Sequence, residues 1–436
     1  MNIYNLISFS SIFVLIGFAW LFSTNRRNLN WRVIIWGILI QLVFALIVFV
    51  FPSGSKVFLF LNDLIVKIMD AASSGAKFIF GRLAVSPGSV SDSGEPSIGF
   101  ILAFQAFPLL IFFSSLMSVL YFLTIMPRLI HLFARLFTKL MNISGAESLC
   151  NASNIFVGVE SALTIKPYIR EMTESELCSV LACGMATAAS STLAVYVITL
   201  KDVFPQIAGH LISASFLAIP AAIIMSKALL PESEIPKTFG MNVTVQYERE
   251  NNIFEAIING ANDGFKLVVG ICALLIAVLG LVSIVDMFLT AVGAKINTFA
   301  HVNIDWTLKG LLGYVFYPFT VLIGVPLDDA DVISKIIGER AIVTEVISYN
   351  DLAAAIKNGD ITNSRSIVIT TYVLCGFAHL ASMAIFVGGF AALCPEKTKL
   401  LSRVAFRALA AATLACLMTG SIAGTFYTSS AILAIQ

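Results

Sequence analysis

Long apolar runs separated by short polar segments are the main pattern along this chain. About eight of these runs approach the roughly 20 residues that a helix needs to cross the hydrocarbon core of a bilayer. They do not alternate apolar and polar positions as the strands of a membrane barrel would, so we expect an all-α polytopic membrane protein. The expected spans are 5–23, 33–51, 99–126, 176–200, 206–230, 267–290, 366–393 and 404–432.

Three polar or amphipathic stretches separate some of these runs. The stretch 53–98 predicts an interfacial helix near Val57–Met69 followed by a loop. The stretch 231–266 is the most polar part of the chain and predicts a solvated loop that leads into an amphipathic helix. The stretch 127–143 predicts a basic amphipathic helix. Its basic face carries Arg128, His131, Arg135 and Lys139.

The basic residues near the span ends predict the orientation of the chain. Lys and Arg cluster after the first, third and seventh spans, and such clusters are typical of cytoplasmic loops. Both chain ends should then lie outside. The topology closes only if 144–168 and 311–352 are re-entrant hairpins, the first entering from the cytoplasm and the second from outside.

This topology predicts an inverted repeat, because each hairpin is preceded by one span and followed by two spans, in opposite orientations. We therefore divide the chain into four parts. They are 1–98 (two spans and an interfacial segment), 99–230 (first repeat), 231–266 (polar loop and amphipathic helix) and 267–436 (second repeat).

Composition supports a membrane protein and excludes several other classes. The chain is 58% hydrophobic and 12% charged, with a mean hydropathy of +0.91, whereas soluble domains carry roughly a quarter charged residues. A net charge of +1 gives no reason to expect a nucleic-acid partner. The seven cysteines are scattered without metal or disulfide spacing, so we expect small buried apolar residues and no cofactor.

Two short segments carry a carboxylate into an apolar environment. They are Asn154–Glu160 and Gly338–Glu345, and each lies between expected spans. Ionisable groups at membrane depth are tolerated only when buried in protein or lining a watery cavity. One such interruption in each half of the chain predicts the substrate site of a secondary transporter. For Glu160 the alternative is a solvated side chain in a cytoplasmic loop.

Two further segments interrupt expected spans with small or polar residues. Gly184–Leu193 would allow close helix packing or a local break whose carbonyls bind a cation, and both interpretations stay open. In Cys375–Ser382, His379 and Ser382 share one helix face. A lone histidine at this depth is often a satisfied interior residue rather than a ligand.

A third segment holds several acids close together. Asp328, Asp329 and Asp331 could form a metal cluster, but no His or Cys accompanies them. An acid-rich helix N-terminus is the favoured interpretation.

Taken in order, these segments resemble the concentrative nucleoside transporter family over most of the chain. Each motif alone is weak, whereas their order and spacing are specific. The motifs are Asn154-Ile-Phe-Val-Gly158 with Glu160, Ile165–Tyr168, Gly184–Thr187, Gly209–Ser215, Gly324–Pro326 with Glu345, Cys375–Ala378 with Ser382, and Arg407–Leu409.

The resemblance implies a nucleoside symporter of a bacterial inner membrane that couples uptake to sodium or, less favoured, to protons. It implies a homotrimer embedded in membrane lipid, with one site per protomer. The site would lie between the two hairpins and the broken spans four and seven. An elevator movement of this unit against a trimer scaffold would carry the substrate across.

The resemblance also assigns residues to the substrate. The ribose side falls on Glu345, Ser382 and His379, where His379 stands at a position usually held by Asn. The base side falls on Glu160 and Thr192, with an aromatic contact at Phe377. The first hairpin tip contains Val159 and is one residue shorter than usual, without the family's amide.

The family's sodium ligands fall on four positions of this sequence. They are the side chains of Asn154 and Thr187 and the carbonyls of Val157 and Ala188. Oxygen ligands of this kind suit a hard monovalent cation. Protons stay open as an alternative, because His379 and the two hairpin acids can titrate.

The sequence leaves two other functions open and gives no support to a third. The unusual Val159 and His379 allow a transporter of the same fold for another polar metabolite. A passive facilitator would show no cation dependence. An enzyme is not expected, because the sequence contains no recognisable nucleophile–base pair or zinc motif.

Overall fold

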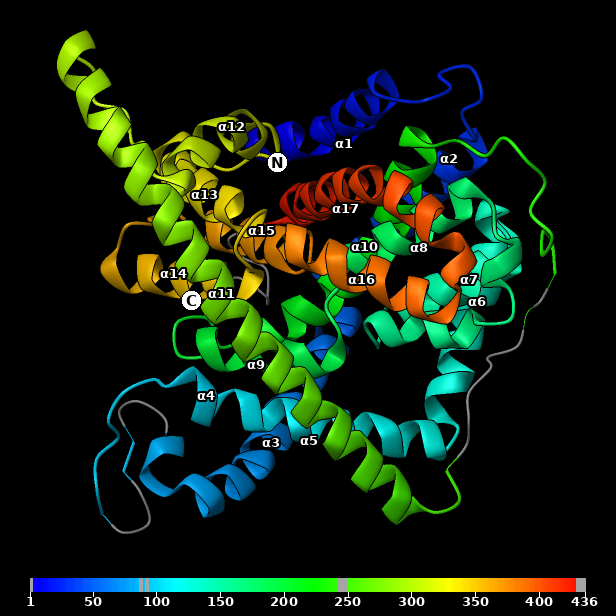
Figure 1. The fold of residues 1–436 in the computed structure, drawn as a ribbon, viewed down its shortest axis with the longest axis horizontal. Helices are drawn as coiled ribbons and strands as arrows, with labels where there is room; N and C mark the ends of the chain where they lie inside the picture. The colour runs from blue at the N-terminus through cyan, green and yellow to red at the C-terminus, as the bar shows by residue number, and fades with distance from the viewer. Residues whose placement is uncertain (1–2, 86–88, 91–93, 242, 244–249, 429–436) are drawn as a thin grey trace.

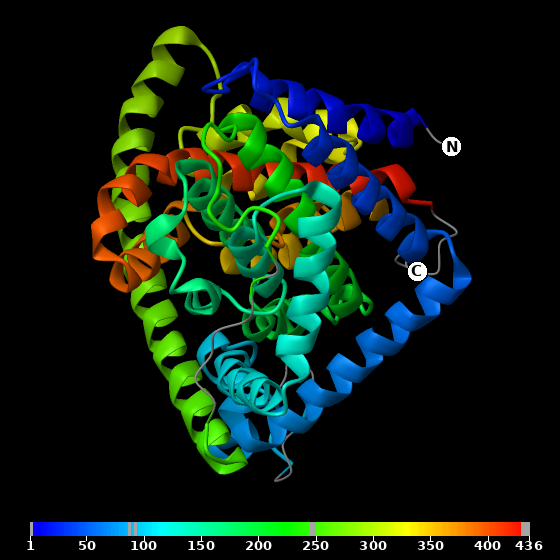
Figure 2. The same cartoon turned by 90° about the vertical axis from the view of Figure 1, so that its right-hand side faces the viewer.

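The computed structural model describes residues 3–85, 89–90, 94–241, 243 and 250–428. Within these ranges the regular secondary structure is helical, with no β-strand. In Figure 1, α11 (Ile253–Ala300) crosses in front of the other helices at an angle, and Figure 2 shows it running along one edge of the molecule. The expected all-α class is confirmed.

Seven helical segments within the described ranges are long and apolar enough to cross a membrane. The seventh expected span, 366–393, consists of two shorter helices, α15 (Ser364–Leu374) and α16 (Leu380–Leu393). The seven segments are α1 (Ile3–Leu21), α2 (Trp31–Phe49), α4 with α5 (Leu102–Gln105, Phe107–Phe122), α8 with α9 (Glu174–Ala186, Ser190–Leu200), α10 (Ile207–Leu229), α11, and η4 with α17 (Pro395–Lys397, Thr398–Phe426).

Two helices are longer than expected from the sequence. Helix α3 runs over Pro52–Phe80, well beyond the interfacial segment at 57–69, and ends in the short 3-10 helix η1 (Gly81–Ala84). Helix α11 begins where Asn252 caps the Glu255 amide and continues to Ala300, so the boundary expected at 266/267 falls inside one helix. The expected amphipathic helix and the sixth span are therefore continuous.

Each half of the chain contains a short helical hairpin preceded by another helix. In the first half, α6 (Ile125–Met141) precedes α7 (Gly145–Ser153), which is followed by the 3-10 helices η2 (Val159–Ile165) and η3 (Ile169–Glu171). In the second half, α12 (Leu308–Leu322) precedes α13 (Leu327–Arg340) and α14 (Glu345–Asn358).

The limits expected for the second hairpin, 311–352, are wrong. They include most of α12, and the hairpin itself is Leu327–Asn358. Gly324 has a φ of +91°, a conformation that suits glycine, and Pro326 precedes the first turn of α13, so the chain turns between the two helices. The passage of either hairpin through a bilayer stays a prediction.

The core lies where α8, α10 and α17 meet, and α11 lies outside it. In the apolar windows of the segments containing α8 and α10, 83% and 89% of residues are buried, against 6% in α11. Helix α11 contacts mainly α5, where Gly260 and Gly264 allow close approach to Ser114 and Ser115. A long apolar helix exposed in this way requires lipid or another chain around it.

The base of the second hairpin is held by buried hydrogen bonds. Asp329 accepts hydrogen bonds from Thr362, Asn363 and Ser366, and Asp331 pairs with Lys335 at 2.9 Å. Among the described residues, no group of three His, Cys, Asp or Glu side chains could hold a metal ion. The acids at 328–331 therefore belong to a helix start, as the sequence favoured.

The buried guanidinium of Arg365 ties this base to the first helix. It donates to the carbonyl oxygens of Gly324 and Tyr4 at 2.9 and 2.8 Å, to Asn5 Oδ1 at 3.2 Å and to Ser8 Oγ at 2.7 Å. Planar guanidinium groups suit such a divergent set of acceptors. Arg365 thus joins α1, α15 and the turn before α13.

Replacing this guanidinium should destabilise the protein. We expect Arg365→Met to lower the free energy of unfolding by on the order of 3 kcal/mol, because each buried acceptor left without a donor costs about 1–3 kcal/mol. Thermal unfolding in detergent would measure the change. The matched control is Arg403→Met, since Arg403 is exposed and makes a surface ion pair with Glu174. Equal midpoints for the two variants would contradict the prediction.

Candidate functional site

The candidate site is built around two helix breaks that contact each other. Helix α8 ends before Thr187 and α9 begins after Ala189, while α15 ends before Cys375 and α16 begins after His379. A Cβ on Gly376 would lie 2.4 Å from the carbonyl oxygen of Ala186. Only glycine permits this approach, so the two breaks meet backbone to backbone.

Glu345 lies at the start of α14 and contacts α9 and the break between α15 and α16. Its Oε1 accepts a hydrogen bond from the Tyr196 hydroxyl on α9 at 2.8 Å, and its Oε2 lies 2.9 Å from Nε2 of His379. All three side chains are buried. A carboxylate can accept about four hydrogen bonds, so lone pairs remain for a ligand hydroxyl.

The break at 375–379 fixes the orientation and the tautomer of His379. His379 caps α16, because its Nδ1 accepts a hydrogen bond from the Ser382 amide at 3.2 Å. In the neutral imidazole, the proton must then be on Nε2, the nitrogen that lies 2.9 Å from Oε2 of Glu345. His379 is a satisfied interior histidine and a neighbour of Glu345 at the same time.

Of the other residues expected in this span, Phe377 lies in the same break and Ser382 lies next to it, in the first turn of α16. The Ser382 hydroxyl contacts the carbonyl oxygens of Phe377 and His379, the latter at 2.8 Å. Phe377 is half-buried and packs against the core. Phe377 lies in the unwound segment, so the direction of its side chain is not the one that a continuous helix would impose.

The first hairpin tip packs against the other break. The amide of Ser190 donates to the carbonyl oxygen of Phe156 at 3.1 Å, and a Cβ on Gly158 would lie 3.5 Å from Cβ of Ala189. On the opposite side, Val159 packs against Gly389 of α16. Residues 154–158 are therefore held next to 187–190.

Glu160 is not joined to the Glu345 cluster. Its side chain is exposed, and its carboxylate is close enough to interact electrostatically with Tyr121 on α5 and Asp263 on α11. Thr192 lies between the two regions and donates to the carbonyl oxygen of Ala189 at 2.8 Å. The structure therefore brings the expected ribose-side residues together and leaves Glu160 facing α5 and α11.

The expected cation ligands lie at the contact between the first tip and the α8–α9 break. Asn154 is fully buried, and neither its amide nitrogen nor its amide oxygen has a hydrogen-bond partner among the described residues. The Thr187 hydroxyl donates to the Cys183 carbonyl at 2.9 Å and keeps its lone pairs. A buried unpaired amide costs about 1–3 kcal/mol, which a bound cation would offset. These oxygen-bearing residues fit a hard monovalent cation.

Tyr196 and Tyr349 belong to this site although the sequence analysis did not single them out. Their rings stack with centroids 4.7 Å apart, and Tyr349 donates to the carbonyl oxygen of Thr371 at 2.9 Å. Tyr196 follows Thr192 by one helical turn. A tyrosine in a buried span needs a partner for its hydroxyl, and this need is the signal that could have identified it.

Comparison with known proteins decides the family. The models for the N-terminus and C-terminus of Na+ dependent nucleoside transporters match residues 10–83 and 210–424, and a nucleoside recognition model matches 103–202. The nucleoside permease NupC of Helicobacter pylori is 33% identical over 427 residues, covering 96% of this chain and 98% of the relative. The chain belongs to the sodium-dependent nucleoside transporter family.

Other members of this transporter family agree in sequence and in fold. Human solute carrier family 28 member 3 is 31% identical over 96% of this chain and 59% of its own. The structure of CNTnw in an inward-facing substrate-bound state matches with a TM-score of 0.85, 32% identity and coverage of 97% and 98%. An outward-facing CNTnw variant gives the same TM-score. The expected family is confirmed, and the protein is a membrane transporter rather than an enzyme.

The hydroxyl of Tyr196 should orient the Glu345 carboxylate. We expect Tyr196→Phe to weaken nucleoside affinity about 10-fold, because a hydrogen bond to a charged group contributes about 1.5–3 kcal/mol while the ring stack is retained. Equilibrium binding to the purified protein would measure the loss. Tyr317→Phe, at a tyrosine on the exposed side of α12, is the control. Unchanged affinity in Tyr196→Phe would exclude this role.

Proposed function

We propose that this protein is a cation-coupled symporter that imports nucleosides together with sodium. The observation that carries the proposal is that two buried polar groups lie near the contact between the two broken spans. Glu345 offers a carboxylate with free lone pairs, and Asn154 offers an unpaired amide. The first suits a sugar hydroxyl and the second a cation.

The ribose side of the site is Glu345, Ser382 and His379. Glu345 accepts hydrogen bonds from sugar hydroxyls, and the buried Ser382 hydroxyl lies in the first turn of α16, next to the second break. Nε2 of His379 lies 2.9 Å from Oε2 of Glu345, beside the carboxylate that would accept from the sugar. His379 can give up this contact to a sugar hydroxyl without losing its cap on α16.

The base side is Val159, Glu160, Thr192 and Phe377. Glu160 is exposed at the first hairpin tip, where it can accept hydrogen bonds from a base that enters between the tip and α5. Thr192 and the half-buried Phe377 supply contacts from the two breaks. A shorter tip without an amide leaves fewer donors for the base.

The sodium ligands are Asn154, Thr187 and the carbonyl oxygens of Val157 and Ala188. Support comes from the contact between 154–158 and 187–190 and from the unpaired Asn154 amide. A cation here would join the first tip to the α8–α9 break. Its binding would thereby complete the wall of the substrate site.

Transport would proceed as an elevator movement of the hairpins and broken spans against α5 and α11. We expect a homotrimer in a bacterial inner membrane, with α11 covered by neighbouring protomers and lipid. Support comes from the 48-residue length of α11 and its exposed apolar surface. Both the repeat and the re-entrant passage of the hairpins are part of this proposal.

Uptake of radiolabelled uridine and adenosine into proteoliposomes tests the function. Uptake would be compared under a sodium gradient, under a proton gradient and without a gradient. Accumulation that requires sodium supports the proposal. Accumulation with protons alone would assign coupling to titratable groups such as His379, and equilibration without any gradient would indicate a passive facilitator.

A second candidate is a transporter of the same fold for another polar metabolite. The specific observations are His379 at the position of the usual asparagine and Val159 in the shortened tip. Absence of nucleoside uptake under every gradient, with binding of another hydroxylated solute, would favour it.

A further inference from the structure

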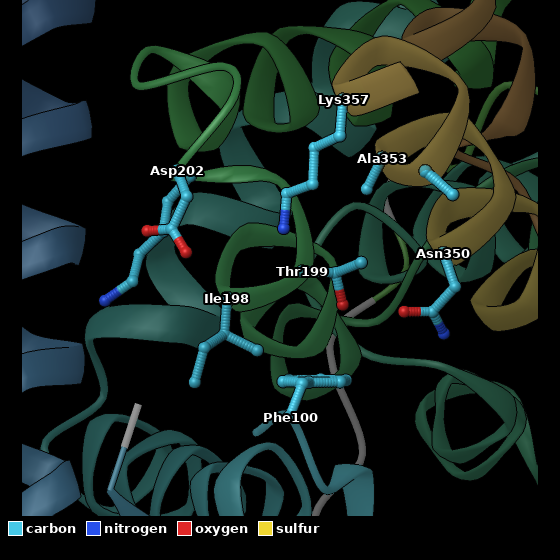
Figure 3. Close-up of a pocket in the computed structure, with 9 residues that line it drawn as sticks. Phe100, Ile198, Thr199, Asp202, Asn350, Ala353 and Lys357 are labelled. Atoms are coloured by element: carbon cyan, nitrogen blue, oxygen red, sulfur yellow. The ribbon is translucent and has the colours of Figure 1, made fainter. Parts of the chain in front are cut away.

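A cavity of about 170 Å³ lies between the C-terminal turns of α9 and α14, outside the site described above. Figure 3 shows Ile198 and Thr199 on α9 opposite Asn350 and Ala353 on α14, with Phe100 closing a third side. Lys357 reaches into the same space from the end of α14. In the orientation predicted from the basic loops, these helix ends face outside.

The cavity is one helical turn away from the stacked tyrosines. Thr199 follows Tyr196 by three residues on α9, and Ala353 follows Tyr349 by four residues on α14, so each pair shares a helix face. The tyrosines are fully buried, and Tyr196 binds Glu345 on their far side. One layer of two stacked rings therefore separates the cavity from the ribose-binding carboxylate.

The lining combines an aromatic ring with polar and charged groups, Lys201 and Asp202 among them, which suits a solute carrying both a flat ring and hydroxyls. Phe100 is partly exposed and offers a ring face, while Thr199, Asn350 and Lys357 offer donors and acceptors. Ligand sites usually measure about 300–1,000 Å³, so this cavity can hold one ring of a nucleoside but not the whole molecule.

We propose that this cavity is an outer vestibule that binds one ring of a nucleoside before it reaches Glu345, and that the stacked Tyr196–Tyr349 pair is the closed gate between them. The inference rests on the proposed nucleoside transport. Opening the gate requires the tyrosines to separate. Tyr196 would release Glu345 during that movement and return to it when the gate closes behind the substrate.

Thiol labelling tests the vestibule directly. Ala354 is exposed and lines the cavity, so Ala354→Cys provides a reporter. Asn358→Cys, exposed at the end of α14, is the matched control outside the cavity. The native cysteines are buried apart from the partly exposed Cys272, and the parent chain measures their background. A membrane-impermeant methanethiosulfonate reagent would be applied to the outside of intact cells.

We expect millimolar uridine or adenosine to slow labelling of Ala354→Cys several-fold and to leave Asn358→Cys unchanged. The protection should persist when Glu345→Gln is added, because the vestibule binds independently of the inner carboxylate. Protection that disappears in the double variant would overturn the proposal, since it would then originate at the inner site. The proposal would also be overturned if nucleosides failed to slow labelling of Ala354→Cys while that variant still transported them.

A kinetic experiment separates the vestibule from the proposed function. We expect Asn350→Leu to raise the KM for uptake from outside several-fold while the equilibrium Kd of the purified protein is unchanged, because a path residue alters access and not final affinity. Equal KM values in Asn350→Leu and the parent would overturn the vestibule and leave nucleoside transport intact. Absence of uptake by the parent itself would overturn both.

Discussion

Nucleoside affinity is expected to fall about 10- to 100-fold in Glu345→Gln. A hydrogen bond to a charged group contributes about 1.5–3 kcal/mol, and 1.4 kcal/mol corresponds to a factor of ten. The loss should be at the upper end because the new amide also faces a donor. One terminal oxygen can still accept from Tyr196, but the NH2 group then points at the Nε2 proton of His379.

His379 cannot adapt to that change without a further loss. Moving its proton to Nδ1 would place a donor against the Ser382 amide and remove the cap of α16. The substitution therefore disturbs both the acceptor for the sugar and the start of α16, which positions His379 beside it. Glutamine in place of glutamate is a small change in shape, so the expected effect is one of hydrogen bonding and charge.

Equilibrium binding and uptake kinetics would be measured together for this variant. Glu171→Gln is the control, because Glu171 is exposed and pairs with Lys237 on the surface. A 2′,3′-dideoxynucleoside adds a second test: it should bind parent and Glu345→Gln almost equally, since it lacks the hydroxyls that the carboxylate accepts. If Glu345→Gln bound uridine with the affinity of the parent, the assignment of Glu345 to the ribose would be wrong.

Hydropathy was sufficient to predict most of the helical architecture. Runs such as 206–230 coincide with α10 within one residue at each end, because burial in an apolar environment imposes both length and composition. The breaks in the fourth and seventh spans were expected from the family resemblance, whereas the small residues at 184–193 taken alone were equally compatible with close helix packing.

Helix ends that depend on local turns were less predictable. The run at 311–323 is apolar and could not be separated from the hairpin until the turn at Gly324 was seen. Likewise, nothing in the pattern showed that α11 would continue through the polar residues near 263–266. Long-range packing against α5 decides that continuity, and a single sequence does not display it.

The site residues divide in the same way, into those that a local pattern reveals and those that depend on a distant partner. Glu345, His379 and Ser382 were identified because polar groups in apolar runs are costly and therefore informative. Tyr196 was missed because tyrosine is ordinary in an apolar helix, and only its hydrogen bond to Glu345 gives it a role. Its importance comes from a partner 149 residues away in the chain, which spacing alone does not reveal.

The second large effect is expected in Asn154→Ala, which should raise the sodium concentration for half-maximal uptake about 10-fold or more. Asn154 is fully buried and unpaired, so its amide oxygen is available to a cation at no cost to any protein contact. Losing one contact to a charged ligand removes about 1.5–3 kcal/mol. Sodium-dependent uridine uptake in proteoliposomes, titrated with sodium at constant ionic strength, would measure the shift.

Thr187 supplies the matched pair of variants for the same site. Its hydroxyl donates to the Cys183 carbonyl and keeps lone pairs for a cation. Thr187→Ser retains that hydroxyl and should keep sodium affinity close to that of the parent, whereas Thr187→Ala should weaken it as Asn154→Ala does. Both substitutions remove the methyl group of the same buried side chain, so a packing defect would lower sodium affinity in both variants. Loss of a sodium ligand would lower it only in Thr187→Ala, because Thr187→Ser keeps the hydroxyl. If uptake in Asn154→Ala and Thr187→Ala kept the sodium dependence of the parent, the coupling cation would have to bind elsewhere.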